Sequence, residues 1–110
     1  SIEIIGIEPK NSAVINGGKA GFHKIQGIGA GFIPKNYNEN FIDKVVEVSD
    51  EDAYKTTVEL AKKEGIFVGI SSGAAVHTAI SVAKKTGKKK KILALAPDSG
   101  NRYLSVDNLF

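Results

Sequence analysis

Residues 72–85 are the part of the sequence that most constrains the fold. Their spacing predicts a helix, and its alanine, valine and isoleucine residues occur on nearly every side rather than along one stripe. A helix that is apolar all round has to be covered from several directions. The whole chain has only 110 residues, and a single small domain buries only a modest share of its surface. This helix therefore needs more neighbours than the rest of the chain offers.

The other regular patterns predict an α/β architecture. A helix is expected to begin at Ser49, where Ser-Asp-Glu-Asp places a hydroxyl and three carboxylates at the first turn, and to stop at Gly65. Strands that alternate with helices favour a mainly parallel sheet flanked by those helices. Short apolar runs predict three strands and one extended piece: residues 2–8, 44–48 and 91–96, and residues 66–70.

The predicted sheet is incomplete on its own. A few short strands and two helices leave its edges open, and residues 9–40 form a glycine- and asparagine-rich stretch with little periodicity. A loop of that length in a small domain indicates a functional role or missing neighbours. We therefore expect residues 1–110 to be a portion of one larger α/β domain, with no second domain in the chain.

Composition excludes several classes of protein. The chain has no cysteine, so it has no disulfide, no thiolate metal site and no cysteine nucleophile. No apolar run approaches the ~20 residues that a membrane span requires, and the first residues alternate like a strand rather than a signal peptide. Lys88–Lys91 indicate a solvated turn, since no aromatic residues interleave with them as nucleic-acid binding would need. These patterns fit a cytoplasmic protein without a membrane, nucleic-acid or metal partner.

A run of alternating glycines lies in the irregular region. Gly27, Gly29 and Gly31 give backbone that can adopt positive φ and approach a ligand closely. The dinucleotide fingerprint is not met, because Phe32 stands where its last glycine should be, and no Gly-Lys-Ser/Thr follows as in a P-loop. From the pattern alone, a flexible loop and a ligand cradle are equally open.

Two adjacent serines open the apolar helix in the string GISSGAA. A serine at this point usually caps the helix, although a helix N-terminus can also hold an anion or a polar ligand atom. The string matches the G-x-S-x-G motif of serine hydrolases superficially, but no base is available to it. His77 follows too closely in the same helix to reach Ser71, and His23 precedes the motif in a loop. Capping and ligand binding therefore both stay open for Ser71 and Ser72.

Three strings together resemble one enzyme family in order and spacing. HKIQGIGAGFIP, EGIFVGISSGAAV and PDSGNRYLS are similar to the C-terminal half of the cysteine synthases, also called O-acetylserine sulfhydrylases. The resemblance covers essentially the whole chain. It implies the larger, C-terminal domain of a fold type II pyridoxal-phosphate enzyme, with the tryptophan-synthase-β-like fold, of which this chain would be about a third.

The resemblance also implies which residues contact cofactor and substrate. Ser71 corresponds to the serine that faces the pyridine nitrogen of pyridoxal phosphate, which leaves Ser72 as the expected helix cap. A neutral hydroxyl there can donate a hydrogen bond to an unprotonated nitrogen. Family members often carry serine where Asp98 stands. The implied cofactor-binding residues are Ser71, Gly27, Pro97 and Asp98, and the implied substrate cleft is lined by Gln26, Gly29 and Ala30.

The implied reaction belongs to cysteine biosynthesis. It is a β-replacement in which sulfide takes the place of the acetate group of O-acetyl-L-serine to give L-cysteine. In the family, the lysine that forms the Schiff base with the cofactor lies in the N-terminal half, so we expect no catalytic residue in this chain and no activity of the isolated 110 residues. The parent enzyme would be a homodimer, and the C-terminal tail of serine acetyltransferase is a further implied partner.

Two other interpretations stay open. Within the same fold, the chain could come from a cystathionine β-synthase or from a synthase that uses O-phosphoserine, because these motifs hardly separate the enzymes. In a different class, the chain could be a non-catalytic binding or assembly module.

Overall fold

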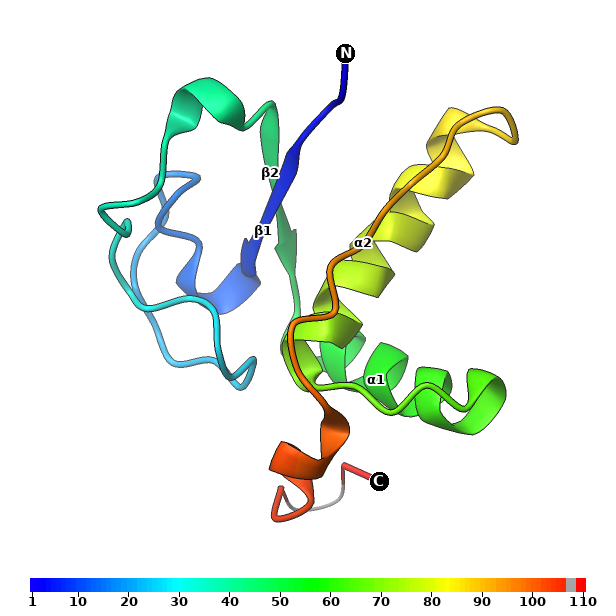
Figure 1. Cartoon of the computed structure of the whole chain (residues 1–110). Helices are drawn as coiled ribbons and strands as arrows, with labels where there is room; N and C mark the ends of the chain where they lie inside the picture. The colour runs from blue at the N-terminus through cyan, green and yellow to red at the C-terminus, as the bar shows by residue number, and fades with distance from the viewer. Residues whose placement is uncertain (107–108) are drawn as a thin grey trace. The chain divides into compact units, whose positions relative to one another are not determined.

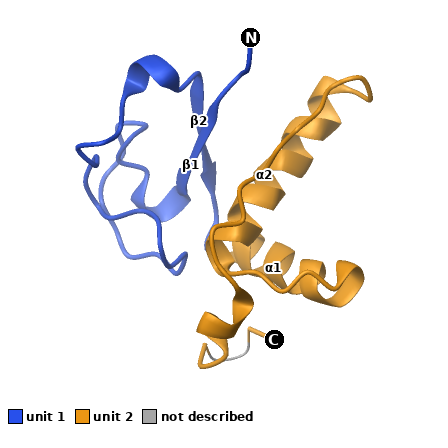
Figure 2. Ribbon diagram, in the orientation of Figure 1, with its two compact units in different colours: residues 1–50 blue, residues 51–110 orange. Residues whose placement is uncertain are grey.

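The structure is a computed structural model that describes residues 1–106 and 109–110. It divides the chain into two compact units, residues 1–50 and residues 51–110, and each is described by itself (Figure 2). Within the described residues, the regular elements are two strands, two α-helices and three short 3₁₀ helices (Figure 1). In chain order they are β1 (Ile5–Pro9), η1 (Lys10–Ser12), η2 (Glu39–Phe41), β2 (Lys44–Val48), α1 (Asp50–Glu64), α2 (Ile70–Thr86) and η3 (Gly100–Tyr103).

Strands β1 and β2 pair in parallel in the first unit. The register runs from Ile5 opposite Lys44 to Pro9 opposite Val48. The prediction of a strand at residues 44–48 is confirmed, whereas β1 begins later than expected and includes its proline. Proline is tolerated in β1 because both strands of a two-stranded sheet are edge strands.

Side chains tie the irregular segment of the first unit to this sheet. The buried Glu8 carboxylate accepts the backbone N–H groups of Ile15 and Asn16, both at 2.9 Å. The side-chain amide of Asn16 donates in turn to the Val45 carbonyl at 3.1 Å. The glycine- and asparagine-rich stretch therefore has fixed anchor points, although few of its residues lie in regular secondary structure.

Helices α1 and α2 cross closely at Gly73 in the second unit. A Cβ atom at this position would lie 2.0 Å from Thr57 Oγ1 and 2.4 Å from the Ala53 carbonyl oxygen. The Thr57 hydroxyl donates to that same carbonyl at 2.8 Å, so its hydrogen bond is satisfied within α1. Ala53, Ile70 and Ala74 are fully buried and form part of the core of this unit.

Helix α2 begins at Ile70, two residues earlier than predicted, and is covered mainly over its first half. The residues of its first turn are buried, while Ile80 is about half exposed. The extended piece predicted at residues 66–70 is reduced to one isolated antiparallel bridge between Val68 and Ser99. The second half of α2 is therefore the part that lacks neighbours within its unit.

The strand predicted at residues 91–96 is wrong for this chain. The segment runs back along α2 as irregular chain (Figure 1), and Leu93 and Leu95 are 98% and 77% exposed. A strand forms only where a neighbouring strand receives its backbone hydrogen bonds, and no described residue pairs with this segment in a sheet. The α/β class is confirmed, as a piece of a fold with two parallel strands and two helices.

Candidate functional site

Three of the predicted substrate and cofactor residues line one pocket in the first unit. The pocket has a volume of about 490 Å³, and Gly27, Gly29 and Ala30 lie in its wall. Gln26 is exposed and is not among the lining residues. A small, mainly apolar cavity with glycine backbone in its wall suits a small ligand. The rest of the wall consists of Ile7, Glu8, Val14, Ile15, Ile28, Phe32 and Pro34.

Glycine is required at position 29 for two reasons. Its φ of 66° lies in the left-handed region, which favours glycine. A Cβ atom there would also lie 2.4 Å from Pro9 Cγ and 2.6 Å from His23 Nε2. Gly27 and Gly31 have φ values of 98° and 84°. The alternating glycines therefore form a turn that other residues would strain.

His23 holds this turn in place, a role that the sequence did not reveal. Its Nε2 lies 2.7 Å from the Gly29 carbonyl oxygen, and its Nδ1 accepts the Ile25 N–H at 3.1 Å. Because a carbonyl oxygen only accepts, Nε2 carries the proton and the ring is the neutral tautomer. His23 is therefore a structural side chain. A histidine in a loop has no periodic signal, so only its closeness in sequence to the glycines could have indicated this role.

The residue that caps α2 is Gly69, so the prediction that Ser72 caps the helix is wrong. Gly69 has extended backbone angles, and the helix begins directly after it. Ser72 therefore lies inside the first turn, where it is 0% exposed and its hydroxyl has no hydrogen-bond partner among the described residues. Ser71 is 8% exposed, and no side-chain hydrogen bond of its hydroxyl is found within residues 1–106 and 109–110. The doublet thus presents two buried hydroxyls at the start of α2.

Asp98 lies against the glycine that caps α2. Its carbonyl oxygen accepts the Gly69 N–H at 3.2 Å, and a Cβ atom on Gly69 would lie 2.1 Å from Asp98 Oδ1. This contact from outside the helix fixes Gly69, which is the physical reason why α2 starts earlier than predicted. Asp98 Oδ1 is buried and has no hydrogen-bond partner among the described residues. Pro97, also predicted at this site, is exposed.

Tyr103 completes this cluster, although no pattern singled it out as functional. It is buried at the end of η3, and its hydroxyl donates to Asp98 Oδ2. Burial, together with this hydrogen bond and the Asp98 charge, raises the pKa of Tyr103 to about 12. The phenol therefore stays protonated and donates throughout the neutral range. The one signal in the sequence was its place in the string PDSGNRYLS.

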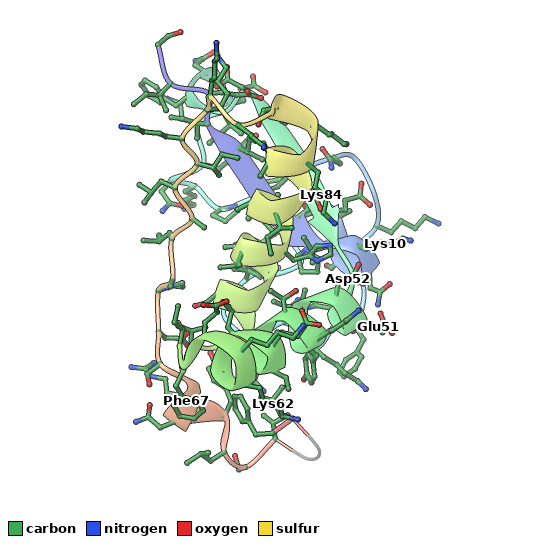
Figure 3. The ribbon with its side chains drawn as sticks, turned by 90° about the vertical axis from the view of Figure 1, so that its right-hand side faces the viewer. Lys10, Glu51, Asp52, Lys62, Phe67 and Lys84 are labelled. Carbon is green, nitrogen blue, oxygen red and sulfur yellow. The ribbon has the colours of Figure 1, made fainter. Side chains whose placement is uncertain are left out.

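Phe67 packs beside Tyr103's helix at the same end of the second unit (Figure 3). Its carbonyl accepts the Gly100 N–H at 3.2 Å, and a Cβ atom on Gly100 would lie 2.7 Å from its ring. The start of η3 is therefore held against the chain that leads into α2.

His77 lies beside α1. Its Nε2 is 3.5 Å from Oδ2 of Asp52, a residue of α1 labelled in Figure 3. This contact agrees with the interpretation that His77 does not serve Ser71 as a base. Among the described residues, no group of three or more histidine, cysteine, aspartate and glutamate side chains could hold a metal ion, and no helix is long and apolar enough to cross a membrane.

The sequence is similar to proteins of one family. Residues 1–98 match the family model described as pyridoxal-phosphate dependent enzyme. The chain is 48% identical over 105 residues to the cysteine synthase of Staphylococcus aureus (strain Mu50 / ATCC 700699), a match that covers 96% of this chain and 34% of that protein. It is 50% identical over 101 residues to the probable cysteine synthase of Bacillus subtilis (strain 168), covering 92% of this chain and 32% of that protein.

The structure is similar to a solved structure over its whole length. The crystal structure of the cysteine synthase from Entamoeba histolytica matches with a TM-score of 0.96 at 43% sequence identity. The match covers 100% of this chain and 32% of that chain. The chain thus spans about a third of the length of the relatives it matches.

Proposed function

The chain belongs to the pyridoxal-phosphate dependent enzyme family, and from that membership we propose that it forms part of a cysteine synthase. The observation that carries the proposal is its 48% identity, over 96% of its length, to a cysteine synthase. The proposed reaction replaces the acetate group of O-acetyl-L-serine with sulfide and releases L-cysteine and acetate. The proposed setting is the cytoplasm.

The start of α2 supports a contact between Ser71 and the cofactor. Ser71 is buried and its hydroxyl has no side-chain partner among the described residues, so it is available to a ligand atom. When bound, pyridoxal phosphate withdraws electrons from the bonds around the α-carbon of an amino acid. The proposed role of Ser71 is to donate a hydrogen bond to the ring nitrogen, which a neutral hydroxyl can do without protonating it. Pro97 and Asp98 are proposed to lie on the same side of the ring, and the unpartnered Asp98 Oδ1 fits a polar ligand nearby.

The pocket of the first unit supports the proposed roles of the glycine run. Gly27 is proposed to contact the cofactor, and Gly29 and Ala30 to line the substrate cleft, because all three lie in the wall of a cavity of about 490 Å³. Backbone N–H groups of glycines can approach a ligand closely. Gln26 is proposed as a cleft residue on the family resemblance alone.

We propose that the 110 residues do not catalyse the reaction by themselves. No lysine of this chain stands in a sequence context that matches the family's Schiff-base lysine. The proposed active form is a homodimer of the whole enzyme, and the C-terminal tail of serine acetyltransferase is a proposed partner.

A chimeric enzyme tests this proposal. The 110 residues would replace the matching third of the S. aureus cysteine synthase, and both bound cofactor and cysteine formation would be measured. We expect the chimera to bind pyridoxal phosphate and to form cysteine from O-acetylserine and sulfide. With Ser71→Ala we expect formation to slow about tenfold or more, the effect of roughly one lost hydrogen bond.

Two outcomes would contradict the proposal. A chimera that binds the cofactor and forms no cysteine would show that these residues do not support the reaction. A clear preference for O-phosphoserine over O-acetylserine, or for homocysteine over sulfide, would instead assign the chain to one of the related synthases.

A further inference from the structure

We propose that Tyr103 is a positioning residue that, through Asp98, fixes the first turn of α2 and hence the placement of Ser71. This role rests on the proposed function, since it matters for catalysis only if Ser71 faces the cofactor. The two side chains and the helix start all lie in the second unit.

The first link is the hydrogen bond between the two side chains. The Tyr103 hydroxyl donates to Asp98 Oδ2 from a buried position. A hydrogen bond to a charged group in such a setting is stronger than one between neutral groups. Burial and Asp98 also raise the pKa of Tyr103, so the donor keeps its proton. The carboxylate is therefore held in one orientation.

The second link is the contact between Asp98 and the helix cap. The Asp98 carbonyl accepts the Gly69 N–H at 3.2 Å, and the carboxylate oxygen Oδ1 fills the space where a side chain on Gly69 would be. A Cβ atom there would also lie 2.6 Å from Tyr103 Cε2. A negative charge at this end of a helix is favoured by the helix dipole. Asp98 and Tyr103 thus close one side of the cap.

The third link runs from the cap into the helix. The Gly69 carbonyl accepts the Gly73 N–H at 3.1 Å. Thr57 Oγ1 of α1 lies 3.4 Å from the same carbonyl oxygen, a longer contact than the 2.8 Å hydrogen bond that it donates to Ala53. Gly69 has no side chain and makes no side-chain capping bond. The contacts that Asp98 and Tyr103 make with Gly69 therefore fix the first turn at its start, as the packing of Gly73 against α1 does at its end, and Ser71 lies between them.

Hydrogen–deuterium exchange of the full chain tests the positioning directly and needs no cofactor. In Tyr103→Phe, which keeps the ring and removes only the hydroxyl, we expect the amides of Gly69 and Gly73, which donate to the Asp98 and Gly69 carbonyls, to exchange about tenfold faster. The reason is that a local opening loses roughly one charge-assisted hydrogen bond. The amides of residues 78–86 should change little. Unchanged exchange at Gly69 and Gly73, or an equal increase along the whole of α2, would overturn the proposal.

Thr78→Val is the matched control. Thr78 is a buried residue of the same helix whose hydroxyl donates to the Ala74 carbonyl at 3.1 Å, so this change also removes one hydroxyl but leaves Gly69 untouched. We expect faster exchange near Thr78 and unchanged exchange at Gly69 and Gly73. The same local increase at Gly69 and Gly73 in both variants would contradict a specific role of Tyr103.

The absorption of bound cofactor in the chimeric enzyme gives a second readout. If Tyr103 positions Ser71, Tyr103→Phe should shift the cofactor absorption band in the same direction as Ser71→Ala, whereas Thr78→Val should not shift it. A chimera that binds no cofactor would contradict the proposed function. The positioning role of Tyr103 would then be decided by hydrogen–deuterium exchange alone. An active chimera with no band shift and no local exchange change would contradict only the positioning role.

Discussion

The two units present their candidate site residues by different means. In the first, Gly29 lies in irregular backbone with positive φ and is enclosed by Pro9 and His23. In the second, Ser71 lies in the first turn of a regular helix whose start is held by contacts to Gly69. Substitution at Gly29 is therefore limited by backbone angle and by space together, and substitution at Gly73 of α2 by space alone.

The largest effect is expected from Gly73→Ala, because the added methyl group meets backbone as well as a side chain. Its Cβ would lie 2.4 Å from the Ala53 carbonyl oxygen, so α1 and α2 would have to separate. Overpacking of this kind costs about 3 kcal/mol, measured as the free energy of unfolding in urea. Ser81→Ala, in the second half of the same helix, is the control and should change little. If Gly73→Ala lowered the free energy of unfolding as little as the control does, α1 and α2 would be able to separate at little cost.

Gly29→Ala, compared with a control, separates the effect of the backbone angle from the effect of limited space. We expect a loss of about 2 kcal/mol, from the left-handed backbone and the contacts with Pro9 and His23. Gly17→Ala is the matched control, because Gly17 has a φ of 86° and nothing within 4 Å of a Cβ atom. It should lose only about 1 kcal/mol, the cost of the backbone angle. Equal losses in urea unfolding would mean that space around Gly29 is not limiting.

Alkaline pH should weaken the second unit through Tyr103. The pKa of Tyr103 is raised from 10.0 to about 12, so the folded state holds the phenolic proton after the unfolded state has released it. This contribution to stability is complete below pH 10 and is lost as the pH rises to about 12. Urea unfolding followed across this range should show a steeper fall for the native sequence than for Tyr103→Phe. Parallel curves for the two proteins would contradict the assignment.

The smallest effect is expected from Ser72→Ala, and it contrasts with a buried serine of the first unit. The Ser72 hydroxyl has no partner among the described residues, so its removal should leave stability unchanged or raise it by up to about 1 kcal/mol. Ser12 is equally buried, but its hydroxyl accepts the Gly21 N–H at 3.2 Å. Ser12→Ala should therefore destabilise by about 1 kcal/mol, and thermal unfolding should rank the two variants in opposite directions.

Elements set by local pattern were predictable from the sequence. The strand at residues 44–48 and the helix after Ser49 follow from apolar runs and turn residues that lie within each segment. The strand at residues 91–96 was not predictable in the same way, because pairing depends on a neighbour that the pattern does not contain. The predicted start of α2 was wrong for a similar reason. The observed start depends on a contact between Gly69 and Asp98, which are distant in sequence.

The candidate site residues also fall into two groups, those that a local motif indicated and those that no motif indicated. The glycine run and the serine doublet were visible as motifs, and three residues of the run do line a pocket. His23 and Tyr103 were missed because each acts through hydrogen bonds within a non-repeating segment, His23 to the Gly29 carbonyl and the Ile25 N–H and Tyr103 to Asp98. Hydrogen bonds of this kind depend on how an irregular segment folds back on itself, and they leave no periodic pattern in the sequence.

The unpaired segment at residues 91–96 also leads to an expectation about how this chain behaves in solution. Its exposed leucines and unused backbone groups make it a template for edge-to-edge stacking of copies. The segment begins with Lys91 and is preceded by Lys88, Lys89 and Lys90. Stacking of copies would bring these positive charges close together, so the charges oppose it. Since salt screens exposed charges over about 8 Å at physiological ionic strength, the chain should remain dispersed at low salt and form assemblies as salt is added.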